Sequence, residues 1–239
     1  MTKTHIFVPC FIDQLYPQTA INMVTILKQV GCSVDYNPNQ TCCGQPALNA
    51  GFWNEAYDVA KKFLADFADK EQVVCPSASC VGFIKNHYAK LLGTDVAAST
   101  LEHLQNHIYE FSEFLVDHCD LSNLTAKLEG KAMYHDACSA LRECQIKEAP
   151  RLLLSKVNGL ELVENPNSEV CCGFGGTFSA KFEPISVAMA EKKVEEALDL
   201  SVDYIISTDL SCLMHLQGYI EKKKIPLKTL HLADVLVGE

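Results

Sequence analysis

The chain has 239 residues, a formal net charge of −10 at pH 7 and an isoelectric point near 5.3. This acidic balance argues against a nucleic-acid binder, which usually carries a basic face, and it gives no attraction to anionic lipid. The hydrophobic fraction of 48% and the charged fraction of 21% are those of an ordinary soluble globular protein.

The start of the chain reads MTKTHIFVPCFIDQLYP and contains only a short apolar run. Such a run is too short for a membrane span and does not have the form of a secretory signal peptide. We therefore expect a cytoplasmic protein with no membrane span.

In chain order, short apolar or β-branched runs alternate with amphipathic helical patterns. Strands are predicted at residues 5–8, 33–36, 72–74, 132–134, 160–163 and 204–207, and helices at 53–67 and 186–198. Residues 94–130 have a helical pattern and are expected to join two halves of the chain. The alternation of strands and helices indicates an α/β fold with parallel sheets.

Twelve cysteines are a high number for such a protein. In a reducing cytoplasm they are expected to bind metal or act in catalysis rather than form disulfides. Eight of them form two sets of four in the same order: Cys10, Cys42, Cys43 and Cys80, then Cys138, Cys171, Cys172 and Cys212. The first two cysteines of a set are 32 or 33 positions apart, and the last two are 37 or 40 positions apart. This repeat predicts an internal duplication with two pseudo-symmetric, Rossmann-like halves, residues 1–120 and 121–239.

Each of these cysteines follows a predicted strand, so each set is expected to converge at the carboxyl ends of a parallel sheet, where such folds bind ligands. Adjacent side chains of a strand point to opposite faces, so a cysteine pair can serve one metal centre only from a turn. Gly44 and Gly173 follow the two pairs and permit such a turn and a close approach of the backbone to a bulky ligand. Residue types that favour helix starts surround the sets: Pro46, Ser77, Ser79, Thr208 and Asp209.

Four thiolates are the usual ligands of an iron–sulfur cluster. Zinc uses the same four residues, but its sites usually contain close C-x-x-C pairs, and this chain has none. Thiol–disulfide chemistry is less compatible with directly adjacent cysteines. The spacing therefore favours iron–sulfur clusters and leaves zinc as an alternative.

The chain resembles the cysteine-rich CCG domain family, which includes the B subunit of heterodisulfide reductase and iron–sulfur subunits of glycolate and anaerobic glycerol-3-phosphate oxidation. The resemblance rests on six segments in one order: FVPCFIDQLYP, CCGQPALNAG, PSASCVGFIKNHY, YHDACSALRE, EVCCGFGGTFS and STDLSCLMHLQGYI. Within the family, the chain is most similar to stand-alone iron–sulfur proteins of bacterial L-lactate utilisation.

The resemblance implies an electron-transfer subunit that acts with two other subunits, one of them ferredoxin-like, in the oxidation of L-lactate to pyruvate. The chain itself has no complete flavin or nicotinamide fingerprint, so a partner is expected to supply the hydride chemistry. An iron–sulfur subunit for another 2-hydroxy acid, such as glycolate, and a zinc-stabilised scaffold that binds partners remain alternatives.

The chain departs from the family in one respect. The five-cysteine version of the motif ends in C-x-x-C, and here Ser77 and Asp209 occupy the position of the first cysteine of that pair. With four cysteines a conventional 4Fe–4S cluster is expected, with one or two clusters per chain, and heterodisulfide reduction is disfavoured. Cys75 stands as a possible fifth ligand or as a buried apolar thiol.

Residues near the cysteines admit more than one role. His135 and Asp136 precede Cys138 and are expected either to tune the second cluster through hydrogen bonds or to anchor a strand end. The cysteines outside the repeat, Cys32, Cys119 and Cys144, are expected to pack as small apolar side chains. The other histidines, including His87, His103, His107 and His215, are expected to be solvated or packed rather than paired at a metal.

Overall fold

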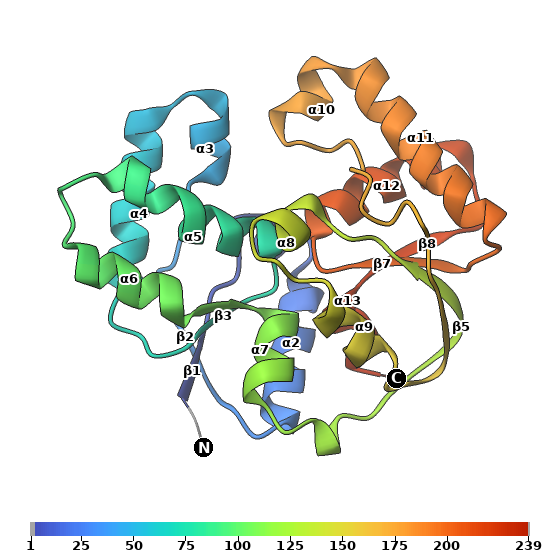
Figure 1. The fold of residues 1–239 in the computed structure, drawn as a ribbon, viewed down its shortest axis with the longest axis horizontal. Coiled ribbons are helices and arrows are strands. Elements are labelled where there is room, and N and C mark those ends of the chain that lie inside the picture. Colours follow the sequence, from blue (N-terminus) through green and yellow to red (C-terminus); the bar gives the residue numbers. More distant parts are fainter. Residues whose placement is uncertain (1–2, 239) are drawn as a thin grey trace.

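The fold, shown by a computed structural model that describes residues 3–238, contains two four-stranded parallel sheets flanked by helices (Figure 1). The strand orders are β2-β1-β3-β4 in the first sheet and β6-β5-β7-β8 in the second. Both sheets therefore place their first and third strands at the centre. This equivalence confirms the predicted α/β architecture with two similar halves.

The first sheet is formed by β1 (Lys3–Ile6), β2 (Ser33–Tyr36), β3 (Val73–Cys75) and β4 (Ile108–Glu110). Its helices are α1 (Cys10–Leu15), α2 (Pro17–Gln29), α3 (Gln45–Ala50), α4 (Trp53–Phe67), α5 (Ala78–Leu92), α6 (Ala98–His107) and α7 (Phe111–His118). β1 pairs with β2 from Lys3 opposite Ser33 to Ile6 opposite Tyr36, and with β3 through His5 and Ile6.

The second sheet is formed by β5 (Ala126–Tyr134), β6 (Val157–Val163), β7 (Tyr204–Ser207) and β8 (Lys228–His231). A short 3-10 helix (Leu121–Asn123) precedes it, and its helices are α8 (Cys138–Arg142), α9 (Glu148–Leu154), α10 (Thr177–Lys181), α11 (Glu183–Asp199), α12 (Leu210–Lys223) and α13 (Leu232–Leu236). The pairing of β5 with β6 contains an irregularity between Lys127 and Gly130.

The stretch between the halves differs from the prediction. Residues 94–130 contain α6 and α7, as the helical pattern indicated, but also β4 and the first residues of β5. The pattern missed β4 because three residues carry too little periodicity. It is a strand because Val73, Val74 and Cys75 of β3 pair with it. β8 was also missed, whereas β2, β7 and α4 have the predicted limits.

The two halves share a hydrophobic core, because each half packs its last helix against the other half. α7 packs on α9, and α13 packs on α2. Asp234 of α13 accepts hydrogen bonds from Thr19 and Asn22 of α2 at 2.9 and 2.8 Å. One continuous buried cluster accordingly contains residues from both sheets, such as Ile6 and Tyr134.

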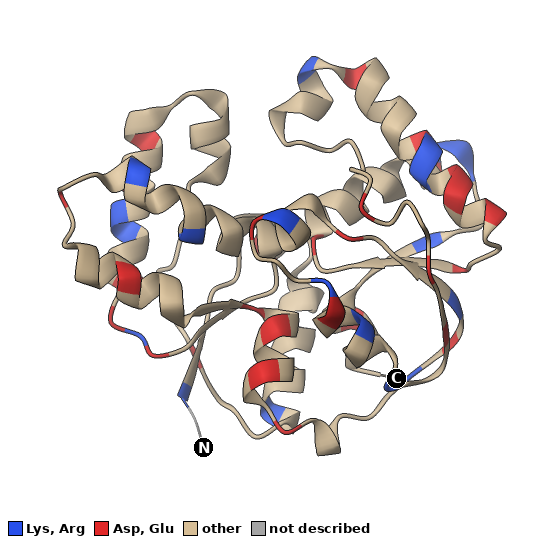
Figure 2. Cartoon of the chain, in the orientation of Figure 1, with Lys and Arg blue, Asp and Glu red and all other residues tan. Residues whose placement is uncertain are grey.

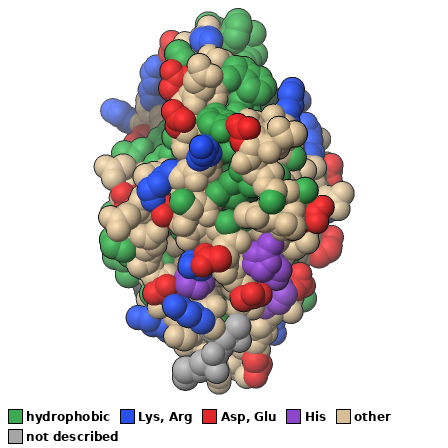
Figure 3. Space-filling view, turned by 90° about the vertical axis from the view of Figure 1, so that its left-hand side faces the viewer, with side chains coloured by type: hydrophobic (Ala, Val, Ile, Leu, Met, Phe, Trp, Pro, Cys, Tyr) green, Lys and Arg blue, Asp and Glu red, His purple; other side chains and the backbone are tan. Residues whose placement is uncertain are grey.

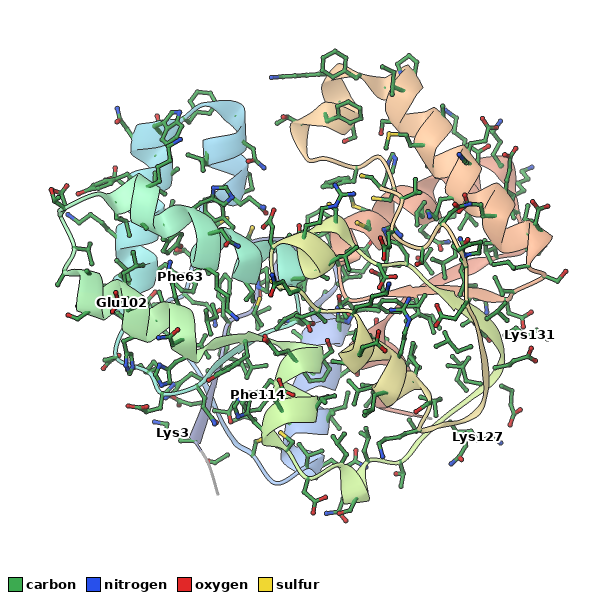
Figure 4. All side chains as sticks on the ribbon, in the orientation of Figure 1. Lys3, Phe63, Glu102, Phe114, Lys127 and Lys131 are labelled. Atoms are coloured by element: carbon green, nitrogen blue, oxygen red, sulfur yellow. The ribbon has the colours of Figure 1, made fainter. Side chains whose placement is uncertain are left out.

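The distribution of side chains follows this core. Phe63 and Phe114 point inward and are buried, whereas Lys3, Lys127 and Lys131 extend into solvent (Figure 4). Charged residues are spread over the periphery, and α3 at the top of the first half carries none (Figure 2). Within residues 3–238, no helix is both long and apolar enough to span a lipid bilayer.

Candidate metal centres

The four sequence-predicted cysteines of the first half lie together at the carboxyl end of their sheet. Cys10 follows β1 and begins α1, Cys42 and Cys43 follow β2, and Cys80 follows β3 in the first turn of α5. The Sγ atoms of Cys10 and Cys42 are 3.5 Å apart, and those of Cys43 and Cys80 are 3.3 Å apart. The fold therefore brings all four thiols into one group.

The second half repeats this arrangement. Cys138 follows β5 and begins α8, Cys171 and Cys172 follow β6, and Cys212 follows β7 in the first turn of α12. The thiol of Cys171 interacts with those of Cys138 and Cys172, and the thiol of Cys172 interacts with that of Cys212. Each half thus presents a four-sulfur group built from the ends of three neighbouring strands.

The glycine after each cysteine pair shapes the turn. Gly44 and Gly173 have φ angles of +95° and +96°, which only glycine adopts readily. Their amide groups donate to the Sγ atoms of Cys42 and Cys171, each at 3.4 Å. The predicted turns are therefore present, and they supply an N–H donor to the first sulfur of each pair.

The glycines also allow close helix packing. A β-carbon at Gly173 would lie 2.7 Å from the carbonyl oxygen of Ser186, at the start of α11. At Gly44 the nearest atom would be the carbonyl oxygen of Ala56 in α4, at 3.3 Å. In this structure each glycine also lies close to a helix, and the approach of the backbone to a ligand stays a prediction.

Helix starts face both sulfur groups. Cys80 and Cys212 are each the third residue of a helix of 15 and 14 residues, respectively. The N-terminus of a helix carries a partial positive charge, which stabilises thiolates and an anionic metal centre. Of the residues with N-cap types, Ser77 and Asp209 occupy the N-cap positions of these helices, but neither side chain makes a capping hydrogen bond.

Of the two residues that replace the missing cysteines, Asp209 contacts the other half, and Ser77 contacts Ser79 in its own half. Asp209, in the second half, accepts a hydrogen bond from the backbone N–H of Ser79 in the first half at 3.0 Å and from the Ser211 hydroxyl at 2.7 Å. Ser77 pairs with Ser79 through their hydroxyl groups at 3.0 Å. The halves also meet where the Phe11 ring of α1 lies 6.4 Å from the ring of Phe174 in the loop before α10.

The pKa values of the thiols differ strongly within each group. Hydrogen bonds from Cys10 and then Cys43 lower the pKa of Cys42 to about 3. In the same way, hydrogen bonds from Cys138 and then Cys172 lower the pKa of Cys171 to about 2. The partner thiols have pKa values raised by donating to these sulfurs and by burial.

This electrostatic pattern suits a bound cation or cluster. In each group one thiol of the cysteine pair has a strongly lowered pKa, whereas donation to that sulfur and burial raise the pKa values of its neighbours. Cys212 in the second group is an exception, with a pKa lowered to about 7. Metal binding displaces thiol protons and balances the thiolate charge. The donor set therefore fits a thiolate-bound metal centre in each half.

Asp136, two residues before Cys138, forms a buried ion pair with Arg151. Asp136 is buried and receives two hydrogen bonds of 2.8 Å from Arg151. Burial opposes ionisation of Asp136, but the guanidinium of Arg151 holds the pKa of the carboxyl below its usual value. Of the two predicted roles, these contacts favour an anchor at the strand end.

His135 lies on the buried side of the second sulfur group. One ring nitrogen and the Sγ atoms of Cys172 and Cys212 all lie within 4.8 Å of one another. A hydrogen bond from Cys172 lowers the pKa of Cys212 to about 7, against the effect of burial, and His135 contributes to this lowering. The structure thus places His135 directly against the sulfurs.

The remaining cysteines are packed. Cys75 is fully buried at the end of β3, with its thiol 3.6 Å from the carbonyl oxygen of Ser77 and near Cys80, and burial raises the pKa of the Cys75 thiol. Cys32 and Cys119 pack against the shared core with their Sγ atoms 3.8 Å apart. Cys144 packs between buried apolar side chains of the two halves, and its thiol lies 3.5 Å from the carbonyl oxygen of Ala78.

A second group of metal-type donors lies away from the cysteines. Glu71, His103 and His107 bring one ligand atom each to within 4.8 Å of the others. Figure 3 shows histidine side chains at the surface beside acidic ones, on the side of the molecule that lies at the left in Figure 1. The sequence analysis did not identify this group, although the spacing of four residues between His103 and His107 on one helix was a usable signal. The expectation that these histidines are solvated or packed rather than paired at a metal stays a prediction.

Comparison with known proteins agrees with this geometry. The profile of the CCG cysteine-rich domain matches residues 4–85 and 132–217, one match for each sulfur group. The chain belongs to the CCG cysteine-rich domain family. This membership confirms the family resemblance and its two repeats.

Curated relatives in this family match over nearly the whole chain. A protein named Lactate utilization protein A from Geobacillus kaustophilus is 40% identical over 98% of each chain. Another of that name from Halalkalibacterium halodurans is 40% identical over 98% of this chain and 96% of its own. A crystal structure of a hypothetical protein from Helicobacter pylori has a TM-score of 0.61 at 13% identity, and the match covers the whole of this chain and 49% of that one. That last likeness concerns the fold alone.

Proposed function

We propose that the chain is an iron–sulfur electron-transfer subunit of a complex that oxidises L-lactate to pyruvate. The observation that carries the proposal is the pair of four-sulfur groups at equivalent sheet edges. The substrate comes from the relatives named Lactate utilization protein A. We further propose that residues 1–120 and 121–239 act as two functional units in a cytoplasmic protein.

The first centre would be held by Cys10, Cys42, Cys43 and Cys80, and the second by Cys138, Cys171, Cys172 and Cys212. Four thiolates favour a 4Fe–4S cluster at each site, which when bound would accept and donate single electrons. The chain contributes the sulfurs, the Gly44 and Gly173 amides that stabilise them, and the helix starts at Cys80 and Cys212.

The four cysteines of each group are buried to different extents. Cys43, Cys80, Cys172 and Cys212 are buried, whereas Cys10 is exposed and Cys42, Cys138 and Cys171 are half-buried. Each sulfur group therefore has one side open towards solvent and one side closed by the core. An electron partner can approach the open side, while the closed side excludes water.

The chain then depends on partners for the reaction of lactate itself. We propose two other subunits, one of them ferredoxin-like, with the hydride chemistry supplied outside this chain. A subunit for another 2-hydroxy acid, such as glycolate, has the same physical basis and differs only in its partner.

A zinc-stabilised scaffold that binds partners is the second candidate. It is favoured by one observation, the group of His135, Cys172 and Cys212, because zinc also binds mixed sulfur and nitrogen ligands. It predicts a colourless protein without redox activity.

The substrate is tested with the anaerobic complex purified through a tag on this chain. L-lactate, glycolate or buffer is added. EPR spectroscopy then follows the iron–sulfur signal that appears when the clusters are reduced. The proposal predicts reduction by L-lactate well above the glycolate and buffer levels. Reduction by glycolate alone would show that the substrate of the complex is glycolate rather than L-lactate. A complex without an iron–sulfur signal would contradict the electron-transfer role.

A further inference from the structure

His135 is a buried histidine whose ring lacks an ordinary partner. Its side chain has no exposed surface, and within the described part of the chain neither ring nitrogen makes a hydrogen bond of good geometry. The Cys212 thiol is the polar group that interacts with the ring. Buried polar atoms in proteins are nearly always paired, so two unpaired nitrogens on one ring need an explanation. The nearest candidate partners are the sulfurs of the second group, because His135 shares a cluster of possible metal ligands with Cys172 and Cys212.

The sheet fixes the position of this ring. The His135 backbone N–H donates to the carbonyl oxygen of Ile206 at 2.8 Å, and its carbonyl oxygen accepts from the Ser207 hydroxyl at 2.9 Å. Both backbone groups of His135 are therefore hydrogen-bonded to residues of β7. The imidazole is held on the buried side of the sulfurs, opposite the more exposed Cys138 and Cys171.

The first half shows that the fold does not require a histidine here. Three residues before its first cysteine stands Phe7, which is also fully buried. The Phe7 ring packs edge-on against Phe63 at 4.8 Å and Phe67 at 5.8 Å. An apolar ring satisfies this position structurally, so the imidazole in the second half calls for a chemical reason.

We propose that His135 is a direct nitrogen ligand of the metal centre in the second half, so that this centre has mixed sulfur and imidazole ligation. The inference rests on the proposed function and exchanges one of the four thiolates of its second site for the imidazole, because a 4Fe–4S cluster takes four protein ligands. Neutral imidazole is a good ligand for iron, and one nitrogen of His135 faces the site where Cys172 and Cys212 converge.

Mixed ligation has a functional consequence. When histidine replaces thiolate at an iron–sulfur centre, the reduction potential rises, because a neutral ligand adds less negative charge. The second centre is therefore the more oxidising of the two. In a reductive titration its signal appears before that of the first centre.

The test uses pulsed EPR on anaerobically purified protein that is reduced with dithionite. Protein is prepared with natural histidine and with ¹⁵N-histidine, so the nitrogen coupling is assigned without changing the sequence. The expected result is a nitrogen hyperfine coupling of the strength of a bound imidazole, which changes with the isotope. It should persist in Cys43→Ser, which lacks the first centre, and disappear in Cys172→Ser, which lacks the second.

Two histidine variants complete the assignment. His135→Phe gives the second half the residue type of the first half and should remove the coupling. His215→Asn is the matched control, because His215 hydrogen-bonds Ser186 near the same loop, and it should retain the coupling. An iron–sulfur signal from the second half without isotope-sensitive coupling, or a coupling retained in His135→Phe, would overturn the inference alone. Absence of any iron–sulfur signal would overturn the proposed function, and the inference with it.

Discussion

The two halves hold equivalent sulfurs in unequal surroundings. On the buried side of the first group lie Phe7 and Cys75. At the equivalent positions of the second group lie His135 and Ser207. The exposed ends of both groups are alike, since each has a first cysteine at a helix start and a pair before a glycine.

This difference teaches which parts of the repeat are constrained by the fold. Strand ends and helix starts place the eight cysteines, and these elements are the same in both halves. The side chains beneath the sulfurs face a core that tolerates a phenyl ring, an imidazole, a thiol or a hydroxyl. Similar scaffolds can therefore hold centres with different ligands and different potentials.

The largest expected effect is the loss of iron from one half when a cysteine of that half is replaced, which makes the two halves unequal. Cys43→Ser should remove the iron of the first half and Cys172→Ser that of the second, so each variant retains about half of the iron in the wild type. Circular dichroism should remain that of a folded protein. Cys144→Ser is the control, because Cys144 lies outside both groups, and it should keep the full iron content. Unchanged iron in both ligand variants would contradict the assignment.

The next effect concerns a charge that exists in the second half alone. Asp136 is paired with Arg151, whereas the equivalent residue of the first half is the apolar Val8. Arg151→Met should lower the free energy of unfolding by about 3 kcal/mol, because it leaves a buried carboxylate without its partner. Urea denaturation measures this change.

The double variant sharpens the same test. Asp136→Val combined with Arg151→Met gives the second half the apolar arrangement of the first and should recover most of the lost stability. If the double variant is as unstable as Arg151→Met, the ion pair acts through something other than charge compensation.

A smaller effect compares the two turn glycines. Gly173→Ala should destabilise by about 2 kcal/mol and Gly44→Ala by about 1 kcal/mol, because both adopt positive φ but only Gly173 also meets the backbone of α11 closely. Thermal or urea unfolding of the two variants under identical conditions gives the order. Equal losses would show that the φ angle alone determines the cost.

The smallest effect compares the caps of the last helices. Glu110 and His231 are buried residues that end β4 and β8 and accept from N–H groups of α7 and α13. Burial raises the pKa of Glu110 from 4.5 to about 7, although Ser112 opposes this, and nearby Glu113 adds to it. Burial lowers the pKa of His231 from its usual 6.5, against the neighbouring Asp234.

These shifts give opposite slopes of stability against pH. Between pH 4.5 and about 7 folded Glu110 binds more protons than unfolded, so it lowers stability as pH rises. Below pH 6.5 unfolded His231 binds more protons than folded, so it lowers stability as pH falls. Glu110→Gln should flatten the first slope and His231→Asn the second, measured by urea unfolding from pH 5 to 8. A profile unchanged in both variants would contradict these assignments.

Some of this molecule could be read from the sequence because its signals are local. β2, β7 and α4 have clear periodicity, and the repeated cysteine spacing predicted both sulfur groups and the turns at Gly44 and Gly173. The short β4 and β8 were not predicted, because β4 has only three residues and β8, with the sequence KTLH, has only one apolar residue, so both depend on pairing with their neighbours.

Contacts between the halves needed the structure. The hydrogen bond from Ser79 to Asp209 joins residues 130 positions apart, and no spacing in the sequence implies it. The burial of His135 likewise depends on the packing around β5 and β7. The sequence suggested that His135 lies near the second centre, but not that its ring is fully buried without a hydrogen bond of good geometry among residues 3–238.

The central claim is that each half binds its own iron–sulfur cluster. The most direct measurement is iron, acid-labile sulfide and zinc per chain after anaerobic purification, with EPR before and after dithionite. The account predicts about eight iron and eight sulfide per chain, little zinc and a signal that appears on reduction. Stoichiometric zinc without sulfide and without an EPR signal would contradict it and would make the two sulfur groups structural zinc sites.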